Sequence, residues 1–232
     1  MLKTEQGFIL NRYWLDTNNQ QKQTLVYWVK SSNGVHQLRF TDQASVFFIP
    51  QPKLKAALNI LGNKLPKNSW HTRSIDLKSF DQEPVSAIYF NQQRTLYFAR
   101  KLLHDSNIYP LESDIQPTDR FMMERNLRGG VRFTGEHRQH QNFTEITNPK
   151  ITALETTVPL TIASIDIETH ISTGELLSIA MIYSDTSAPD KLVEKVWMIG
   201  EPFDSASLHY LNMVDNESNL LKAFITFFNW FV

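Results

Sequence analysis

The sequence of 232 residues contains no cysteine. This absence excludes disulfide bonds, thiolate zinc sites and a cysteine nucleophile, and it suits a protein of a reducing compartment. No apolar run approaches the roughly 18 residues of a membrane-spanning helix. The amino-terminal residues also lack the apolar stretch and the small-residue cleavage site of a signal peptide. We therefore expect a cytoplasmic protein without a membrane partner.

Neither sign of charge is in excess. The 23 Lys and Arg residues nearly balance the 24 Asp and Glu residues, and the net charge is −1. This balance excludes a basic coat over the whole surface, although it leaves room for a local basic patch. Hydrophobic residues make up 41% of the chain, which is enough for a packed core and excludes a disordered chain. The length predicts one large domain or two modest ones.

The amino-terminal part of the sequence predicts an α+β domain. Branched and aromatic residues concentrate in four short segments, which indicates a β-meander. These segments are residues 8–14, 24–30, 35–40 and 45–49. Helical and strand periods then alternate. The spacing predicts a helix over 54–61, a strand over 85–90, a helix over 95–104 and a short helix over 118–125.

A second domain is predicted in the remainder of the chain. Residues 137–150 are polar and lack a period, so we interpret them as a linker and place the boundary between about residues 145 and 158. Residues 1–152 form the first domain and residues 153–232 the second. Strands are predicted at residues 160–168, 176–183 and 193–199, and an amphipathic helix begins near residue 216. Its apolar stripe consists of Leu220, Leu221, Phe224, Phe227, Phe228 and Phe231.

The sequence ends at Val232, inside this apolar stripe and without a stop signal for the helix. We interpret the chain as a fragment of a longer protein. The helix would then lack later partners and leave its stripe partly uncovered, and one edge of the strand at 160–168 would be unpaired. Both features favour self-association of the fragment.

Two carboxylates, Asp166 and Glu168, stand at the end of the apolar strand. Side chains alternate along a strand, so the two carboxylates share one face while Ile165 and Ile167 point into the core. Mg²⁺ or Mn²⁺ would relieve their mutual repulsion, and paired metals are the usual arrangement for phosphodiester hydrolysis. Carboxylates that reach solvent, or that pair with Arg or Lys, are the competing interpretation. These residues alone leave both interpretations open.

Residues 163–169 (ASIDIET) resemble the first exonuclease motif, D-x-E, of family B DNA polymerases. Segments upstream resemble the amino-terminal domain of the bacterial DNA polymerase II branch of that family, and they occur in the expected order. These segments are residues 7–10, 45–50, 114–117 and 120–125. The resemblance spans most of the chain. The combination of these segments is specific, whereas the short D-x-E motif would be a weak signal on its own.

The resemblance implies that Asp166 and Glu168 are catalytic carboxylates and ligands of Mg²⁺ or Mn²⁺ in a two-metal 3′–5′ proofreading exonuclease. It implies an RNase H-like fold for the second domain, truncated here. The parent would be a template-directed DNA polymerase in DNA repair and replication restart, and its partners would be primer-template and a single-stranded 3′ end. The remaining metal-binding carboxylates and the polymerase domain would lie beyond Val232, so we expect the chain alone to be inactive.

Two alternative functions stay open. The first is a free-standing RNase H-like nuclease with an accessory domain. The second is a non-catalytic nucleic-acid- or protein-binding module in which Asp166 and Glu168 are merely structural. The sequence carries no glycine-rich phosphate loop, Ser/His/Asp elbow or dinucleotide fingerprint that would point to another enzyme class.

A weaker candidate is an arginine-rich stretch with interleaved phenylalanines. Guanidinium groups on phosphates and aromatic rings on bases would form a path for single-stranded nucleic acid, with Arg128 and Arg132 as the binding residues. The competing interpretation is a mixed-charge surface whose phenylalanines pack inward. The stretch contains Arg120, Arg125, Arg128, Arg132 and Arg138, with Phe121, Phe133 and Phe143, around Gly129 and Gly130.

Three histidines complete the candidates. His137 and His140 have a spacing that binds metal on a helix, but their polar surroundings favour a solvated linker. His170 directly follows the D-x-E strand and could approach a metal or a phosphate, although a surface histidine at a strand end is the simpler interpretation.

Overall fold

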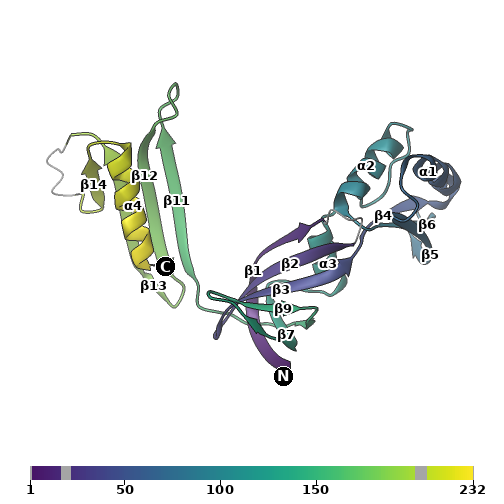
Figure 1. The fold of residues 1–232 in the computed structure, drawn as a ribbon, viewed down its shortest axis with the longest axis horizontal. Helices are drawn as coiled ribbons and strands as arrows, with labels where there is room; N and C mark the ends of the chain where they lie inside the picture. The colour runs from purple at the N-terminus through teal and green to yellow at the C-terminus, as the bar shows by residue number, and fades with distance from the viewer. Residues whose placement is uncertain (1, 17–21, 202–207, 232) are drawn as a thin grey trace. The chain divides into compact units, whose positions relative to one another are not determined.

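The computed structural model describes residues 2–16, 22–201 and 208–231. The chain forms two compact units, Met1–Val158 and Pro159–Val232 (Figure 1). The division follows residue 158, while the predicted first domain ends at residue 152. Among the helices that the structure describes, none combines the length and apolar character needed to cross a bilayer.

A seven-stranded sheet with the order β10-β7-β1-β2-β3-β9-β8 forms half of the first unit. Its strands are β1 (Leu2–Leu15), β2 (Gln23–Ser31), β3 (Gly34–Gln43), β7 (Gly130–Glu136), β8 (Arg138–Gln139), β9 (Thr144–Thr147) and β10 (Lys150–Ala153). The antiparallel β1–β2–β3 meander confirms the first three predicted strands. Helix α3 (Pro117–Glu124) inserts Phe121 into the core of this sheet, beside Tyr27 and Phe40.

Two predictions are wrong in this region. The segment 137–150 is not a linker, because β8 and β9 lie within it and β9 runs parallel to β3. Ile146 of β9 is fully buried in the sheet core, so this polar segment is an integral part of the first sheet. The predicted fourth strand of the meander does form, but it belongs to another sheet.

That second sheet has three strands in the order β4-β6-β5, and it forms a lobe with two helices (Figure 1). The elements are β4 (Ser45–Pro50), α1 (Gln51–Lys64), β5 (Trp70–Lys78), β6 (Pro84–Phe90) and α2 (Gln93–His104). Apolar residues of α1 and α2 pack on one face of the sheet and form a core separate from that of the first sheet. The predicted helices and the strand at 85–90 are confirmed, whereas β5 was not predicted.

The second unit is a four-stranded sheet in the order β11-β12-β13-β14 with one helix. The elements are β11 (Thr161–Thr169), β12 (Leu176–Asp185), β13 (Ala188–Ile199), β14 (Leu211–Val214) and α4 (Glu217–Phe231). The first three strands are antiparallel and confirm the prediction, while β14 runs parallel to β13. The core contains Ile179, Met181, Trp197 and Leu220.

Helix α4 confirms the predicted amphipathic helix. Leu220 is fully buried and Phe224 packs against Trp197, whereas Leu221 remains 40% exposed. The stripe is therefore partly covered by the strands of its own unit. The side chain of Phe231, the last residue of the predicted stripe, lies outside the described residues.

Candidate functional site

Asp166 and Glu168 lie on β11, on the face of the sheet opposite α4. The antiparallel register places Asp166 beside Ala180 and Glu168 beside Ser178, whereas Ile167 lies beside the buried Ile179. Because side chains alternate along a strand, both carboxylates point away from the helix-covered face. The shared face that the sequence predicts is therefore present.

The predicted burial of this strand is wrong. Every residue of β11 is exposed, and Ile165 and Ile167 are 45% and 56% exposed although they point to the side of α4. The reason is the position of the strand. β11 stands at the edge of the sheet, and the helix packs over β12, β13 and β14 instead. The apolar run of β11, which has the sequence pattern of a central strand, therefore forms an edge strand of the four-stranded sheet.

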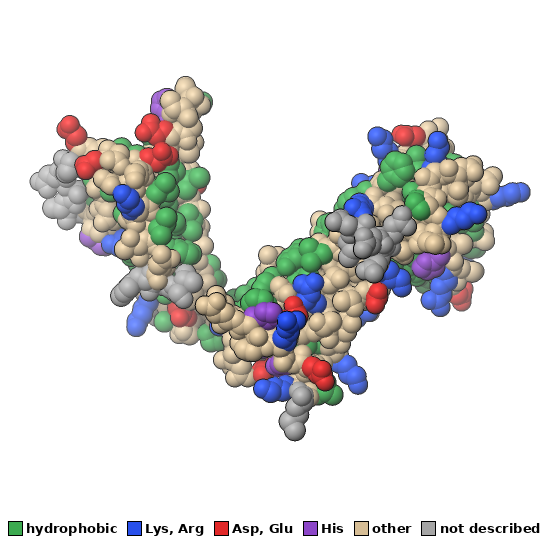
Figure 2. Space-filling view, viewed as in Figure 1, with side chains coloured by type: hydrophobic (Ala, Val, Ile, Leu, Met, Phe, Trp, Pro, Cys, Tyr) green, Lys and Arg blue, Asp and Glu red, His purple; other side chains and the backbone are tan. Residues whose placement is uncertain are grey.

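The two carboxylates can supply part of a cation site. Within the described residues, neither Asp166 nor Glu168 takes part in an ion pair. One Asp166 carboxylate oxygen accepts a 3.1 Å hydrogen bond from the backbone N–H of Ile167, which fixes its orientation. Figure 2 shows acidic side chains gathered at the end of the second unit where β11 turns into β12. Oxygen ligands on one open face suit a hard divalent cation.

Within the described parts of the chain, however, no three His, Cys, Asp or Glu side chains come together around a point where a metal ion could sit. The two carboxylates therefore fit a hard cation as two of its ligands, and further ligands are needed for a closed site. His170 does not add one: its Nδ1 accepts a hydrogen bond from the backbone N–H of Thr173, so the neutral ring carries its proton on Nε2 and neither nitrogen has a free lone pair for a cation.

Arg128 and Arg132 lie on an exposed part of the first sheet. Arg132 belongs to β7, where it is paired with Gln6 of β1 and Thr152 of β10, and its side chain faces outward. Arg128 lines a surface cavity of about 430 Å³ beside the ring of Phe8. Neither arginine forms an ion pair with any other described residue. Both can therefore face a phosphate.

Other parts of the chain fill the space where side chains would stand on the neighbouring Gly129 and Gly130. A Cβ atom on Gly129 would lie 2.5 Å from the Phe8 ring, and one on Gly130 would clash with the Leu154 carbonyl. Gly129 and Gly130 nevertheless line the cavity beside Arg128, so part of their backbone stays accessible. Small residues are needed there because β1 and the segment after β10 pack against this turn.

Two other arginines of the predicted path, Arg120 and Arg125, are engaged within the chain. Arg120 binds the Glu112 carboxylate at 2.7 Å, and the Arg125 guanidinium lies 3.8 Å from the centre of the Phe121 ring. Phe121 and Phe133 are buried in the sheet core. The interpretation in which phenylalanines pack inward is correct for these two residues, and Arg128 and Arg132 remain as candidates for contact with nucleic acid.

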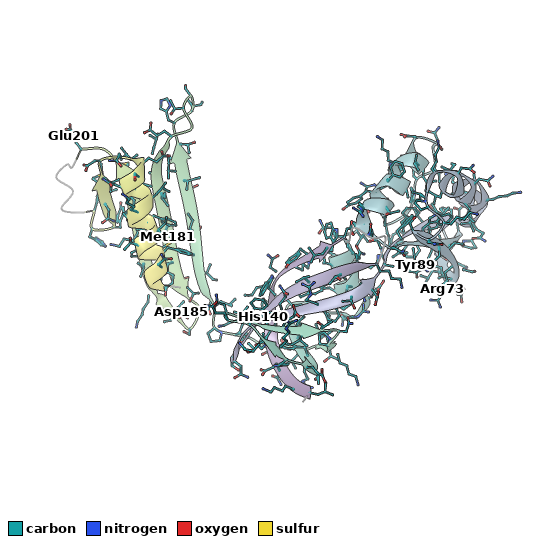
Figure 3. The ribbon with its side chains drawn as sticks, in the orientation of Figure 1. Arg73, Tyr89, His140, Met181, Asp185 and Glu201 are labelled. Atoms are coloured by element: carbon teal, nitrogen blue, oxygen red, sulfur yellow. The ribbon has the colours of Figure 1, made fainter. Side chains whose placement is uncertain are left out.

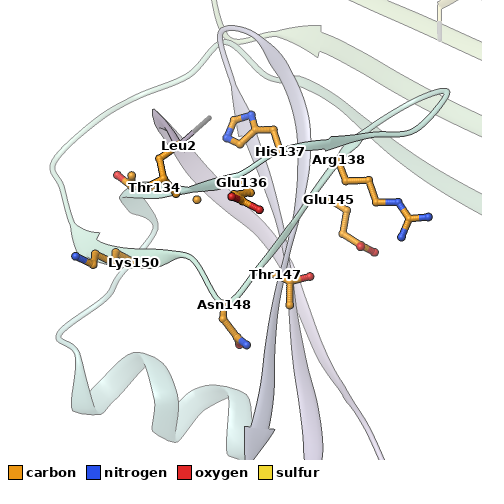
Figure 4. A pocket seen from close by; sticks show the side chains of 10 residues that line it. Leu2, Thr134, Glu136, His137, Arg138, Glu145, Thr147, Asn148 and Lys150 are labelled. Atoms are coloured by element: carbon orange, nitrogen blue, oxygen red, sulfur yellow. The ribbon is translucent and has the colours of Figure 1, made fainter.

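His137 and His140 do not form a metal pair on a helix, because they lie on either side of β8. His140 stacks on Phe143 with ring centroids 4.6 Å apart. His137 lines a cavity of about 610 Å³ with Glu136, Arg138 and other polar side chains (Figure 4). Its ring lies 5.9 Å from that of His36, and burial lowers the pKa of both imidazoles.

One pair of side chains was missed by the sequence reasoning. His71 of β5 stacks on Tyr89 of β6, with ring centroids 5.1 Å apart and 11° between the planes. The two residues are 18 positions apart and become neighbours only through strand pairing. The excess of basic residues in the lobe that carries them is a signal that could have directed attention to this surface.

The chain is similar to known DNA polymerases. Residues 45–108, the two-helix lobe, match the family model described as DNA polymerase II, insertion domain. The chain is 30% identical to DNA polymerase II of Escherichia coli (strain K12) over 225 residues, which are 96% of the chain and 27% of the relative.

The fold is similar to the solved family B DNA polymerase of the hyperthermophilic archaeon Pyrobaculum calidifontis, with a TM-score of 0.58 and 15% identity. That match covers 86% of the chain and 27% of the polymerase. The chain thus spans about a quarter of the length of both proteins. The resemblance to family B DNA polymerases of the polymerase II type, expected from the D-x-E strand and the segments upstream of it, is confirmed.

Proposed function

We propose that the chain is part of a template-directed DNA polymerase of the polymerase II type that carries a 3′–5′ proofreading exonuclease and acts in DNA repair and replication restart. The match to E. coli DNA polymerase II over 225 residues, covering 96% of the chain, carries this proposal. DNA is its partner, as primer-template and as a single-stranded 3′ end, and its compartment is the cytoplasm. The alternatives of a free-standing nuclease and a non-catalytic module have no comparable support.

The assignment of residues 153–232 to the start of an RNase H-like exonuclease domain is part of this proposal. Three antiparallel strands followed by a helix are the expected opening of such a domain, and β11, β12, β13 and α4 occur in this order. The additional strand β14 lies between β13 and α4. Residues 1–152 form the amino-terminal α+β domain in this assignment.

Asp166 and Glu168 are the proposed metal ligands and catalytic residues. In the complete site, bound Mg²⁺ or Mn²⁺ would activate water and stabilise the leaving oxygen of the phosphodiester. What this chain contributes is the placement of two carboxylates at alternate positions of an exposed strand, with their charges uncompensated by an ion pair among the described residues. A cation that binds here neutralises their repulsion.

A manganese titration tests this assignment. Mn²⁺ is paramagnetic, so binding at Asp166 and Glu168 will broaden the NMR amide signals of β11 and β12. Asp166→Asn is expected to remove the broadening. The matched control is Asp81→Asn, since Asp81 and Glu83 have the same spacing on an exposed turn of the first unit. Equal broadening around both acidic pairs would show non-specific binding and contradict the assignment.

Arg128 and Arg132 are proposed to contact phosphates of single-stranded DNA. Binding by the chain alone will be weak, because its net charge is −1 and Arg120 and Arg125 of the predicted path are engaged within the chain. Each phosphate contact contributes about −0.7 to the slope of log affinity against log salt. The double change Arg128→Gln with Arg132→Gln should therefore make the slope shallower. Tight binding that survives high salt would contradict weak, mainly electrostatic binding.

We also propose that the chain self-associates through the second unit. β11 is an edge strand, and edge strands with unpaired backbone groups invite another chain to pair. Ile162, Ile165 and Ile167 are 52%, 45% and 56% exposed along it, and no proline interrupts the strand. Leu221 and Ile225 of α4 are also exposed.

A further inference from the structure

The lobe that matches the insertion domain has a charge unlike that of the whole chain. Residues 45–108 contain nine Lys and Arg residues and four Asp and Glu residues, a net charge of +5, although the chain as a whole carries −1. Figure 2 shows Lys and Arg side chains projecting around this lobe, at the right of the view. A local field of this sign attracts a polyanion.

The sheet of the lobe has one face covered by helices. Phe47, Ile49, Ile88 and Phe90 point to this face, are buried, and pack against α1 and α2. The opposite face is defined by the alternate residues. In register they form one row of Val46, Tyr89 and His71, and a second row of Phe48, Ala87 and Arg73.

The β4 side of this opposite face is covered within the chain. Phe48 lies under the guanidinium of Arg120, 5.3 Å from the ring centre, and its backbone forms a bridge with Leu111. Val46 is 5% exposed. The uncovered part of the face therefore lies on the β5 side, where the strand is at the sheet edge.

Three side chains occupy this uncovered part. The His71 ring lies parallel to the Tyr89 ring, which makes a flat aromatic pair, and His71 is exposed while Tyr89 is half-buried. Arg73 is exposed and stands two residues along β5 from His71, on the same face. Figure 3 shows Arg73 and Tyr89 on the same side of the lobe. Asp76 is the acidic residue of this strand, and it lies three residues beyond Arg73.

We propose that this face of the lobe, built from His71, Arg73 and Tyr89, binds single-stranded nucleic acid. A base stacks on the His71–Tyr89 pair, the Arg73 guanidinium binds the adjacent phosphate, and the lysines of the lobe supply the surrounding field. Stacking on an exposed ring beside a cation is how sequence-independent single-strand binding is achieved, because every base offers a flat face. The site is separate from the Arg128 and Arg132 surface and from Asp166 and Glu168.

The chemistry of the face selects a single strand over other polyanions. In a duplex the base faces are stacked on one another, so a flat ring pair has nothing to stack on. An acidic protein segment would use the charge of the lobe but gain little from parallel rings. Variants of the aromatic pair can therefore distinguish binding of single-stranded nucleic acid from binding of a duplex or of an acidic protein segment.

Fluorescence anisotropy with the full chain and a labelled oligothymidylate of about 12 nucleotides tests the proposal. Tyr89→Leu removes the ring and is expected to raise Kd about tenfold, which corresponds to about 1.4 kcal/mol. Tyr89→Phe keeps the stacking and should bind as the parent chain does. Because Tyr89 is half-buried, His71→Ala provides a second variant at an exposed position. Arg73→Gln should make the salt slope shallower by about 0.7.

Controls separate this site from the surface at Arg128 and Arg132. Phe98→Leu changes a 50% exposed aromatic residue of α2 in the same lobe and should leave Kd unchanged. The Arg128→Gln and Arg132→Gln pair should change the salt slope without altering the tenfold effect of Tyr89→Leu. A duplex of the same length, and polyglutamate, should bind more weakly and respond equally to Tyr89→Phe and Tyr89→Leu.

Three results would overturn the inference while leaving the proposed polymerase function intact. The first is parental affinity for the oligonucleotide in both Tyr89→Leu and His71→Ala. The second is equal binding of polyglutamate, which would show a purely electrostatic surface. The third is binding that disappears only with Arg128 and Arg132. Conversely, absence of manganese binding at Asp166 would contradict the exonuclease assignment and leave this site unaffected.

Discussion

The phenol hydroxyl of Tyr27 donates a 2.7 Å hydrogen bond to the backbone carbonyl of Thr118. This bond joins β2 of the first sheet to the first turn of α3, two elements separated by 91 positions in sequence. Tyr27 is fully buried, and burial raises the pKa of its hydroxyl far above the ordinary value. The hydroxyl therefore stays protonated, and able to donate this bond, around neutral pH.

Tyr27→Phe is expected to lower the free energy of unfolding of the first unit by about 1 kcal/mol, because it removes the hydrogen bond and keeps the packing of the ring. Urea unfolding followed by circular dichroism measures the change. Tyr97→Phe is the matched control, since Tyr97 is 37% exposed on α2. An equal midpoint for both variants would show that the bond to Thr118 contributes nothing net.

A second prediction concerns two neighbouring histidines, His36, which is buried, and His137, which is half-buried. Burial is the main cause that lowers the pKa of each imidazole, and the negative charge of Glu5 acts in the opposite direction on both. The positive charge of Lys30 further lowers the pKa of His36, and that of Lys3 further lowers the pKa of His137. In the unfolded chain these histidines bind protons with a pKa near 6.5. The unfolded state therefore binds more protons just below that pH, and the first unit should lose stability as the pH falls below about 6.5.

His36→Gln tests this pH dependence. Glutamine cannot titrate but can bond to Ser31, whose hydroxyl lies 2.8 Å from His36 Nε2. The variant should lose less stability than the parent between about pH 6.5 and 5. His71→Gln is the control, because His71 is exposed on β5. Parallel curves of stability against pH for the parent and His36→Gln would contradict the prediction.

Local periodicity was enough to find most of the helices and strands. It failed where the partner of a segment is distant in sequence. β9 carries one buried residue, Ile146, among polar ones, and it is held by parallel pairing with β3 more than a hundred residues earlier. β4 follows β3 directly, yet both its faces are largely buried, and it pairs with β6 in another sheet.

The same limit applies to the candidate site. Strand alternation alone predicts that Asp166 and Glu168 share a face. It cannot predict that Ile165 and Ile167 are exposed, since their burial depends on where α4 packs. The stacking of His71 on Tyr89 likewise depends on the register between β5 and β6, which no local pattern of the sequence specifies.

A third prediction is that the chain alone has no exonuclease activity. Asp166 and Glu168 are two ligands, and no cluster of three metal-binding side chains occurs among the described residues, whereas two-metal hydrolysis needs a fuller set. Incubation with single-stranded DNA and Mg²⁺ or Mn²⁺ should leave the DNA intact. Trimming that Asp166→Ala abolishes would overturn this.

In a full-length polymerase carrying this segment, the same substitution has a different expected effect. Asp166→Ala should remove 3′–5′ proofreading while primer extension continues, because the two reactions reside in separate domains of the family. Loss of both reactions, with the fold preserved, would contradict the assignment of Asp166 to the exonuclease alone.

The last prediction concerns self-association and uses the boundary between the units. β10 (Lys150–Ala153) pairs with β7, and the first compact unit extends to Val158, so a chain shortened to residues 1–158 keeps that unit complete. Shortening at residue 150 would remove most of a paired edge strand. The 1–158 chain lacks β11 and α4 and should be monomeric by light scattering. The 232-residue chain should form dimers or larger species whose proportion rises with protein concentration.

Ile165→Lys in the 232-residue chain is expected to reduce this association. A charge on an exposed edge strand opposes pairing with a second strand, and Ile165 is already 45% exposed, so the fold of the unit should tolerate the change. Lys191→Gln, on β13, which lies between β12 and β14 in the sheet, is the control and should leave association unchanged. A parent chain that is monomeric at all concentrations, with equal hydrogen-exchange protection in both units, would show that the edge of β11 needs no partner.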